Sequence, residues 1–68
     1  MNSDLLREHL KEKNITIKTL AQVMNLSRQS VHAKLNGKVP VTTKEATAIV
    51  QTLNLSDEEA LELFLREE

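Results

Sequence analysis

The stretch LAQVMNLSRQSVHAKLNGK, residues 20–38, decides the fold, because its residue types suit two short helices joined by a tight turn. Ala21 is small enough to let the two helices approach closely. Asn25, four residues later, tolerates the left-handed backbone that such a turn requires. Leu26 is then expected to point inward, and Val31 to lock the second helix onto the first. This spacing predicts a helix-turn-helix over about residues 16–36.

Apolar residues recur at helical spacing along nearly the whole chain, and no strand-like alternation occurs. Helices are predicted at residues 3–13, 17–24, 28–35, 43–53 and 57–65. Each begins after a good N-terminal capping residue, namely Asn2 or Ser3, Thr16, Ser27, Thr42 and Ser56. Glu45 and Glu59 complete capping boxes in the last two helices, and Asn36-Gly37 ends the third. The sequence therefore predicts one all-α domain over residues 1–68, with five helices in a compact, orthogonal packing.

The inner face of each predicted helix follows from its apolar stripe. The stripes are Leu6 and Leu10; Ile17, Leu20, Ala21 and Met24; Val31 and Leu35; Ala46, Ile49, Val50 and Leu53; and Leu61, Phe64 and Leu65. Leu63 falls on the opposite side of the last helix from its stripe, so it is expected at the surface. A single exposed leucine is ordinary, but Leu63 is also a candidate dimer contact.

Charge is distributed unevenly along the chain, although the formal net charge of the whole sequence is only −1. Residues 11–44 carry seven basic side chains against Glu12, net +6, whereas residues 45–68 carry Arg66 against seven acidic side chains, net −6. The predicted helix-turn-helix lies in the basic part, which favours an anionic partner. The acidic run SDEEALE, residues 56–62, suits the first turn of a helix, and a contact face for a basic partner is the alternative.

Several classes of function receive no support from the composition. The chain has no cysteine, no signal-peptide pattern and no apolar run long enough for a membrane span, so a soluble, cytoplasmic protein is expected. Phe64 is the only aromatic residue, which excludes base stacking on an aromatic platform. His9 and His32 lie on different predicted helices without paired ligand spacing, so neither a metal nor another cofactor is expected. No catalytic constellation occurs, and an enzyme is not expected.

Residues 20–38 resemble the helix-turn-helix of lambdoid phage repressors and Cro proteins, the wider Xre-like family. The shared features are Leu-Ala-Gln at the start, the tight turn, a polar Gln-Ser step in the second helix and Asn-Gly-Lys at the end. The resemblance implies a five-helix, lambda-repressor-like fold and a DNA-binding transcriptional regulator of bacterial or phage origin, such as a small Cro-like or repressor-modulating protein. Three departures stand out: Asn25 replaces the usual glycine, Ile17 replaces a phosphate-contacting glutamine of some members, and Lys34-Leu35 moves the last buried aliphatic residue by one position.

In this family the recognition helix, here about residues 28–35, enters the major groove of double-stranded DNA. With Val31 facing inward, the base-contact candidates by position are Arg28, Gln29, His32 and Ala33. Arginine recognises guanine, glutamine recognises adenine, and alanine contacts a thymine methyl group. Backbone-contact candidates are Ser27, Ser30, Lys18, Lys38, Thr43 and Lys44, with amides near Thr16 and Ile17 as a further phosphate site.

Two readings of this surface remain open. One recognition helix reads few base pairs, so the first is a homodimer on a pseudo-palindromic operator with half-sites about 34–36 Å apart. The second is a protein-binding modulator, for example of a partner repressor, that uses the same fold without strong DNA affinity. Taken singly, each of these polar or basic side chains could also be an ordinary solvent-exposed residue with no binding role.

Overall fold

The computed structural model describes residues 1–65, which form five helices and no strand. The helices are α1 (Ser3–Glu12), α2 (Ile17–Met24), α3 (Arg28–Leu35), α4 (Thr43–Leu53) and α5 (Asp57–Phe64). All five predicted helices are confirmed, and only the C-terminal ends of α1 and α5 differ from the predicted bounds, each by one residue. The all-α fold with a helix-turn-helix in α2 and α3 is therefore confirmed as well.

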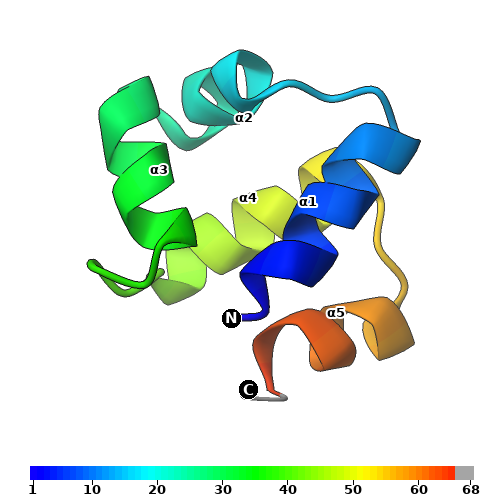
Figure 1. Ribbon diagram of the computed structural model, residues 1–68. Coiled ribbons are helices and arrows are strands. Elements are labelled where there is room, and N and C mark those ends of the chain that lie inside the picture. Colours follow the sequence, from blue (N-terminus) through cyan, green and yellow to red (C-terminus); the bar gives the residue numbers. More distant parts are fainter. Residues whose placement is uncertain (66–68) are drawn as a thin grey trace.

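The helices do not form an up-and-down bundle, because α3 stands across the direction that α1 and α4 share (Figure 1). Figure 1 shows α3 along the left edge, α2 above it, α5 at the bottom, and α4 running through the middle. Helix α2 packs against both α3 and α4, and α1 packs against α5. The two ends of the described chain also meet, because the backbone N–H of Asn2 donates to the carbonyl of Leu63 at 2.8 Å. Helix α5 thereby closes the core from below.

Local side-chain chemistry explains where each helix starts. Thr16, Ser27, Thr42 and Ser56 each accept a hydrogen bond from the backbone N–H three residues later, as predicted. Both predicted capping boxes form, with Glu45 and Glu59 accepting from the N-cap backbone. At α1 the cap is Asn2, whose side chain accepts from Leu5, while Ser3 Oγ instead donates to the carbonyl of Leu35 at the end of α3.

The turn between α2 and α3 has the predicted left-handed residue. Asn25 ends α2 at φ 57° and ψ 42°, and Leu26 N–H donates to the carbonyl of Ala21 at 2.9 Å. Asparagine thus fills the position where a glycine is usual. At the end of α3 the left-handed residue is Gly37, with φ 78°, one position after Asn36.

One leucine-rich core holds the helices together. Its buried members are Leu6, Leu10, Leu20, Ala21, Val31, Leu35, Ile49, Leu53, Leu55 and Leu63. Half-buried apolar residues, including Leu26, pack around this core. The stripes predicted for α1 to α4 all face it, with at least two buried members each. In those four helices periodicity alone therefore identified the inner face.

The orientation predicted for α5 is wrong. Leu63 is fully buried, with 0% exposure, whereas Leu61 and Leu65 are 53% and 72% exposed. Two stripes compete on this helix, and the structure buries the one formed by Ala60, Leu63 and Phe64. Ala60 is half-buried, and its small side chain lets α5 pack closely against the rest of the domain on this side. The surface dimer contact hypothesised for Leu63 is therefore overturned, because this side chain is inside the core.

Because Leu63 and not Leu61 or Leu65 is buried, α5 exposes an apolar surface to solvent. A groove of about 710 Å³ lies between α5 and the segment that follows α3. Val39, at 43% exposure, Leu61 and Leu65 border it, and they are three of the four exposed large apolar residues within residues 1–65. The fourth, Val23, lies on α2.

Candidate nucleic-acid interface

Helix α3 presents one face to the core and the opposite face to solvent. Val31 and Leu35 are buried, at 2% and 3% exposure, and they fix the helix on the domain. Three of the four predicted base-contact residues, Arg28, Gln29 and His32, are exposed. The fourth, Ala33, is half-buried. In Figure 1, α3 lies at the edge of the molecule, so this outer face is open to a large partner.

The hydroxyl groups at the start of α3 form a short relay. Ser27 Oγ accepts from the Ser30 N–H at 3.1 Å and donates to Ser30 Oγ at 3.0 Å. In this arrangement the hydroxyl hydrogen of the half-buried Ser30 has no acceptor within residues 1–65, so it can donate to a phosphate. Thr16 and Thr19 repeat the same pattern at the start of α2, with 3.1 Å for both bonds. Thr19 was not among the predicted contacts, although its spacing from Thr16 matches that of Ser30 from Ser27.

The predicted backbone-contact cations lie on three different elements. Lys18 is exposed on α2, Lys38 on the segment after α3, and Lys44, next to the exposed Thr43, at the start of α4. None of these three lysines, nor Arg28, has an ion-pair partner within residues 1–65. Along the chain, Ser27 and Ser30 lie at the N-terminal end of α3 and Lys38 follows its C-terminal end. Lys44 instead lines a hollow together with Met24 and Asn25 at the end of α2. The candidate phosphate ligands thus flank α3 on both sides in the sequence.

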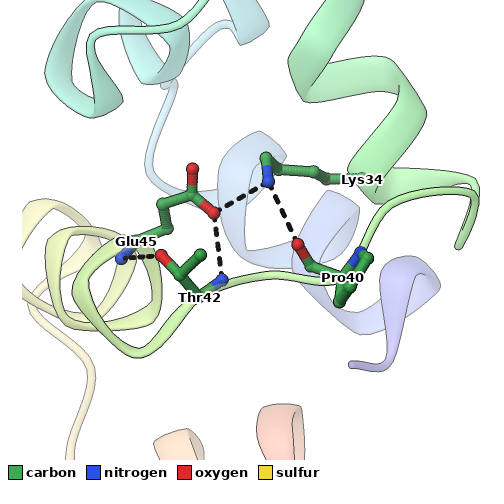
Figure 2. Close-up of polar contacts among 4 residues, drawn as sticks. All are labelled: Lys34, Pro40, Thr42 and Glu45. Carbon is green, nitrogen blue, oxygen red and sulfur yellow. Dashed lines mark hydrogen bonds and ion pairs between the residues drawn. The ribbon is translucent and has the colours of Figure 1, made fainter.

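One lysine of the basic region is turned inward instead. The Lys34 side chain is only 10% exposed, and its Nζ lies 2.9 Å from Oε1 of Glu45 and 3.0 Å from the carbonyl oxygen of Pro40. Figure 2 shows these contacts together with the capping box of α4, in which Glu45 Oε1 also accepts from the Thr42 N–H at 3.0 Å. Sequence reasoning counted Lys34 with the basic residues but did not find its partner. The only sequence feature that pointed to an unusual environment for Lys34 was its neighbour Leu35, the last buried aliphatic residue of α3, which is shifted by one position from the family pattern.

The same contacts favour the ionised form of Glu45. The Thr42 backbone N–H that donates to its carboxylate lowers the pKa of Glu45 below the ordinary value of 4.5, and the Lys34 ammonium lowers it further against the opposing effect of burial. In the second capping box, the Ser56 N–H lowers the pKa of Glu59 in the same way. Glu59 also faces the buried His9, whose Nδ1 lies 4.0 Å from its Oε2.

These lowered pKa values predict acid sensitivity. A carboxyl whose pKa is lower in the folded state binds fewer protons there than in the unfolded chain. Its stabilisation is therefore present above the ordinary pKa of 4.5 and is lost as the pH falls through the lowered folded value. We expect urea midpoints, followed by circular dichroism from about pH 7 to about pH 3, to decline below that ordinary value.

Matched substitutions locate the origin of this decline. Glu45→Gln and Glu59→Gln should each flatten it, because the amide does not titrate. Glu8→Gln is the control, since Glu8 is an exposed carboxylate of α1 without a hydrogen bond or ion pair within residues 1–65. Equal flattening by all three substitutions would contradict the assignment to the two capping boxes.

Comparison with known families places the fold. A family model described as a Cro/C1-type HTH DNA-binding domain matches residues 5–64. The protein belongs to this Cro/C1-type family. The match confirms the resemblance drawn from residues 20–38 and supports a DNA-binding regulator; domains of this family are typically not enzymes. A search of curated proteins and a search of solved structures each found no significant match.

Two further structural findings bear on the Cro/C1-type domain. No helix within residues 1–65 combines the length and hydropathy that a bilayer-crossing segment requires. In the same part of the chain, no three histidine or carboxylate side chains are grouped so that they could hold a metal ion.

Proposed function

We propose that the protein is a sequence-specific transcriptional regulator of the Cro/repressor type, with residues 1–68 acting as one DNA-binding domain. The observation that carries the proposal is the exposed outer face of α3, with Arg28, Gln29 and His32, on a helix whose inner face is buried. In a family of DNA-binding domains this face is the natural one to enter the major groove. By occupying an operator, the protein would keep other proteins off that DNA and so regulate transcription in a bacterial or phage-infected cell.

Base recognition in this proposal belongs to Arg28, Gln29, His32 and Ala33. The guanidinium of Arg28 matches O6 and N7 of guanine, and the amide of Gln29 matches N6 and N7 of adenine. His32 offers a ring nitrogen, and Ala33 a methyl group suited to a thymine methyl. Each good bidentate contact discriminates against the wrong base by about 1–3 kcal/mol.

Phosphate contacts fix the helix in the groove. The proposed ligands are Ser27, Ser30, Lys18, Lys38, Thr43 and Lys44. Support comes from the exposed lysines and from the free hydroxyl hydrogen of Ser30. Because these contacts release counterions, affinity should fall steeply with salt for every duplex.

A homodimer on a pseudo-palindromic site completes the proposal. A single α3 spans too few base pairs for specific regulation, and two copies related by a two-fold axis would place two recognition helices about 34–36 Å apart. Leu63 takes no part in such a dimer, because it is buried in the core.

Selection of bound sequences from a random duplex pool, followed by a salt series on the selected duplex, tests the proposal. We expect an enriched motif with two inverted half-sites and a linear fall of log affinity with log salt. Retention of no duplex at low salt would refute DNA binding. Enrichment of single half-sites would refute the dimer alone.

A protein-binding modulator is the second candidate, and one observation favours it. The apolar groove bordered by Val39, Leu61 and Leu65 lies beside an α5 surface that also exposes Asp57, Glu58 and Glu62. A basic partner protein with an apolar anchor fits this surface. Stoichiometric capture of a partner repressor, combined with no retention of duplex DNA, would decide for this function.

A further inference from the structure

Lys34 is the basic residue of α3 that the proposed DNA contacts do not use. We propose that Lys34 is a positioning residue: it does not touch DNA, but it fixes the end of the recognition helix and the segment after it against α4. This inference rests on the proposed function for its effect on DNA, and on the geometry of residues 34–45 for its mechanism. We call the contacts of Lys34 with Glu45 and Pro40 the Lys34 latch.

The latch joins three segments at one carboxylate oxygen. Glu45 Oε1, in the first turn of α4, accepts from Lys34 Nζ on α3 at 2.9 Å and from the Thr42 N–H at 3.0 Å. The same Lys34 Nζ donates to the carbonyl of Pro40 at 3.0 Å (Figure 2). The relative position of α3, the connecting segment and α4 is therefore set by hydrogen bonds of defined direction, in addition to apolar packing.

The connecting segment has few other hydrogen bonds, although Val41 is half-buried and packs against the core. Gly37 N–H and Lys38 N–H donate to the carbonyls of Lys34 and Ala33 at 3.1 and 3.0 Å. From Val39 to Val41, the bond from Lys34 to the Pro40 carbonyl is the only hydrogen bond within the described part of the chain. Lys38 and Lys44, two proposed phosphate ligands, flank this stretch. Loss of the latch would therefore leave this stretch with the packing of Val41 but without a hydrogen bond, and would loosen the position of both lysines relative to the base-reading face.

The burial of Lys34 argues against a role as a phosphate ligand. Its side chain is 10% exposed, that of Glu45 is 15% exposed, and two of the three ammonium hydrogens are directed at protein acceptors. A phosphate would have to displace Glu45, whose negative charge already compensates the ammonium. Buried ion pairs of this kind contribute little net stability, because desolvation offsets their attraction. The main consequence of the latch is therefore expected in geometry.

Three variants separate positioning from charge. Lys34→Met keeps an unbranched apolar stem and removes the ammonium. Glu45→Gln keeps an acceptor for Thr42 but replaces the charge-assisted bond from Lys34 by a weaker bond to a neutral amide. Lys38→Met is the matched control, because it makes the same substitution at the neighbouring exposed lysine. The probes are the duplex selected from a random pool by the unmodified protein and a scrambled duplex of the same composition. Circular dichroism checks whether each variant folds, and Glu45→Gln carries the test if Lys34→Met does not fold.

For Lys34→Met and Glu45→Gln we expect the ratio of affinities for selected over scrambled duplex to fall by about tenfold, comparable to the loss of one base contact. Their salt slopes should stay unchanged. Lys38→Met should keep the affinity ratio and lower the salt slope by about one. A salt slope lowered by Lys34→Met as much as by Lys38→Met would identify Lys34 as a phosphate ligand and overturn the proposal. An unchanged affinity ratio would also overturn it.

Amide hydrogen exchange tests the latch without DNA. In Lys34→Met and Glu45→Gln, the amides of Gly37 and Lys38 should exchange about tenfold faster than in the unmodified protein, whereas Lys38→Met should leave the Gly37 amide unchanged. Unchanged exchange in the first two variants would refute the latch. If the unmodified protein selects no duplex, the proposed function fails, but the exchange experiment still decides whether Lys34 orders this segment.

Discussion

Leu63→Ala is expected to unfold a large fraction of the protein at room temperature. Leu63 has 0% exposure, and truncating a buried leucine to alanine costs about 2–5 kcal/mol. A domain of this size has only about 3–5 kcal/mol of stability from its core. The loss should be near the upper end of about 2–5 kcal/mol, because Leu63 is fully buried on a helix that packs against α1, so its truncation leaves a cavity in the core. Urea unfolding followed by circular dichroism measures it.

Leu65→Ala is the matched control for this substitution. It deletes the same atoms two residues later, at a position that is 72% exposed, so we expect a change within about 0.5 kcal/mol. The apolar stripe chosen from the sequence predicts the reverse order, with Leu65 inside and Leu63 outside. A greater loss of stability for Leu65→Ala than for Leu63→Ala would therefore contradict the packing of α5 in the structure.

Substitutions on α3 have the largest expected effect on DNA recognition. Arg28→Ala and Gln29→Ala should each relax base preference at one position of the selected site, with a loss of about 1–3 kcal/mol of discrimination. Lys38→Ala should weaken binding to all duplexes similarly and reduce the salt slope by about one. The physical reason is that a base edge differs between sequences, whereas a phosphate does not. Competition titrations with single-base variants of the selected duplex measure both effects.

Gln51→Ala supplies the control for the α3 substitutions, since Gln51 is an exposed glutamine on α4 and lies outside the proposed interface. It should change neither base preference nor salt slope. If Arg28→Ala, Gln29→Ala and Lys38→Ala all weaken every duplex equally, the division between base-reading and phosphate-binding residues is wrong. The DNA-binding proposal itself would survive that result.

Local rules predicted most of the fold because they act over a few residues. A capping side chain reaches a backbone N–H three positions away, so Thr16, Ser27, Thr42 and Ser56 mark helix starts wherever the helices finally pack. The left-handed Asn25 follows from the same short-range sterics. Inner faces were also predictable where one stripe was clearly the most apolar, as in α2 with Leu20 and Ala21.

The candidate interface was predictable only in part. Exposure of Gln29 followed from its angle to the buried Val31 on a regular helix. The same angle placed Ala33 on the outer face, yet Ala33 is half-buried. The fate of Lys34 did not follow, because its partners, Pro40 and Glu45, belong to the connecting segment and α4. Their distance from Lys34 depends on how α3 and α4 are placed. No spacing rule within one helix contains that information.

The sequence by itself determined the helices, their caps, the left-handed turn and the membership of the Cro/C1-type family, because each depends on contacts within a few residues or on a short motif. Only the tertiary structure decided which side of α5 is buried and which lysine of the basic region is withdrawn from solvent. On α5 the two competing stripes share Phe64, but the predicted one is more apolar, because it has Leu61 and Leu65 where the other has Ala60 and Leu63. Hydrophobicity alone therefore favours the wrong side, and the packing of α5 against α1 decides for Leu63. For Lys34, the Glu45 carboxylate at the start of α4 attracts the ammonium and draws it away from solvent.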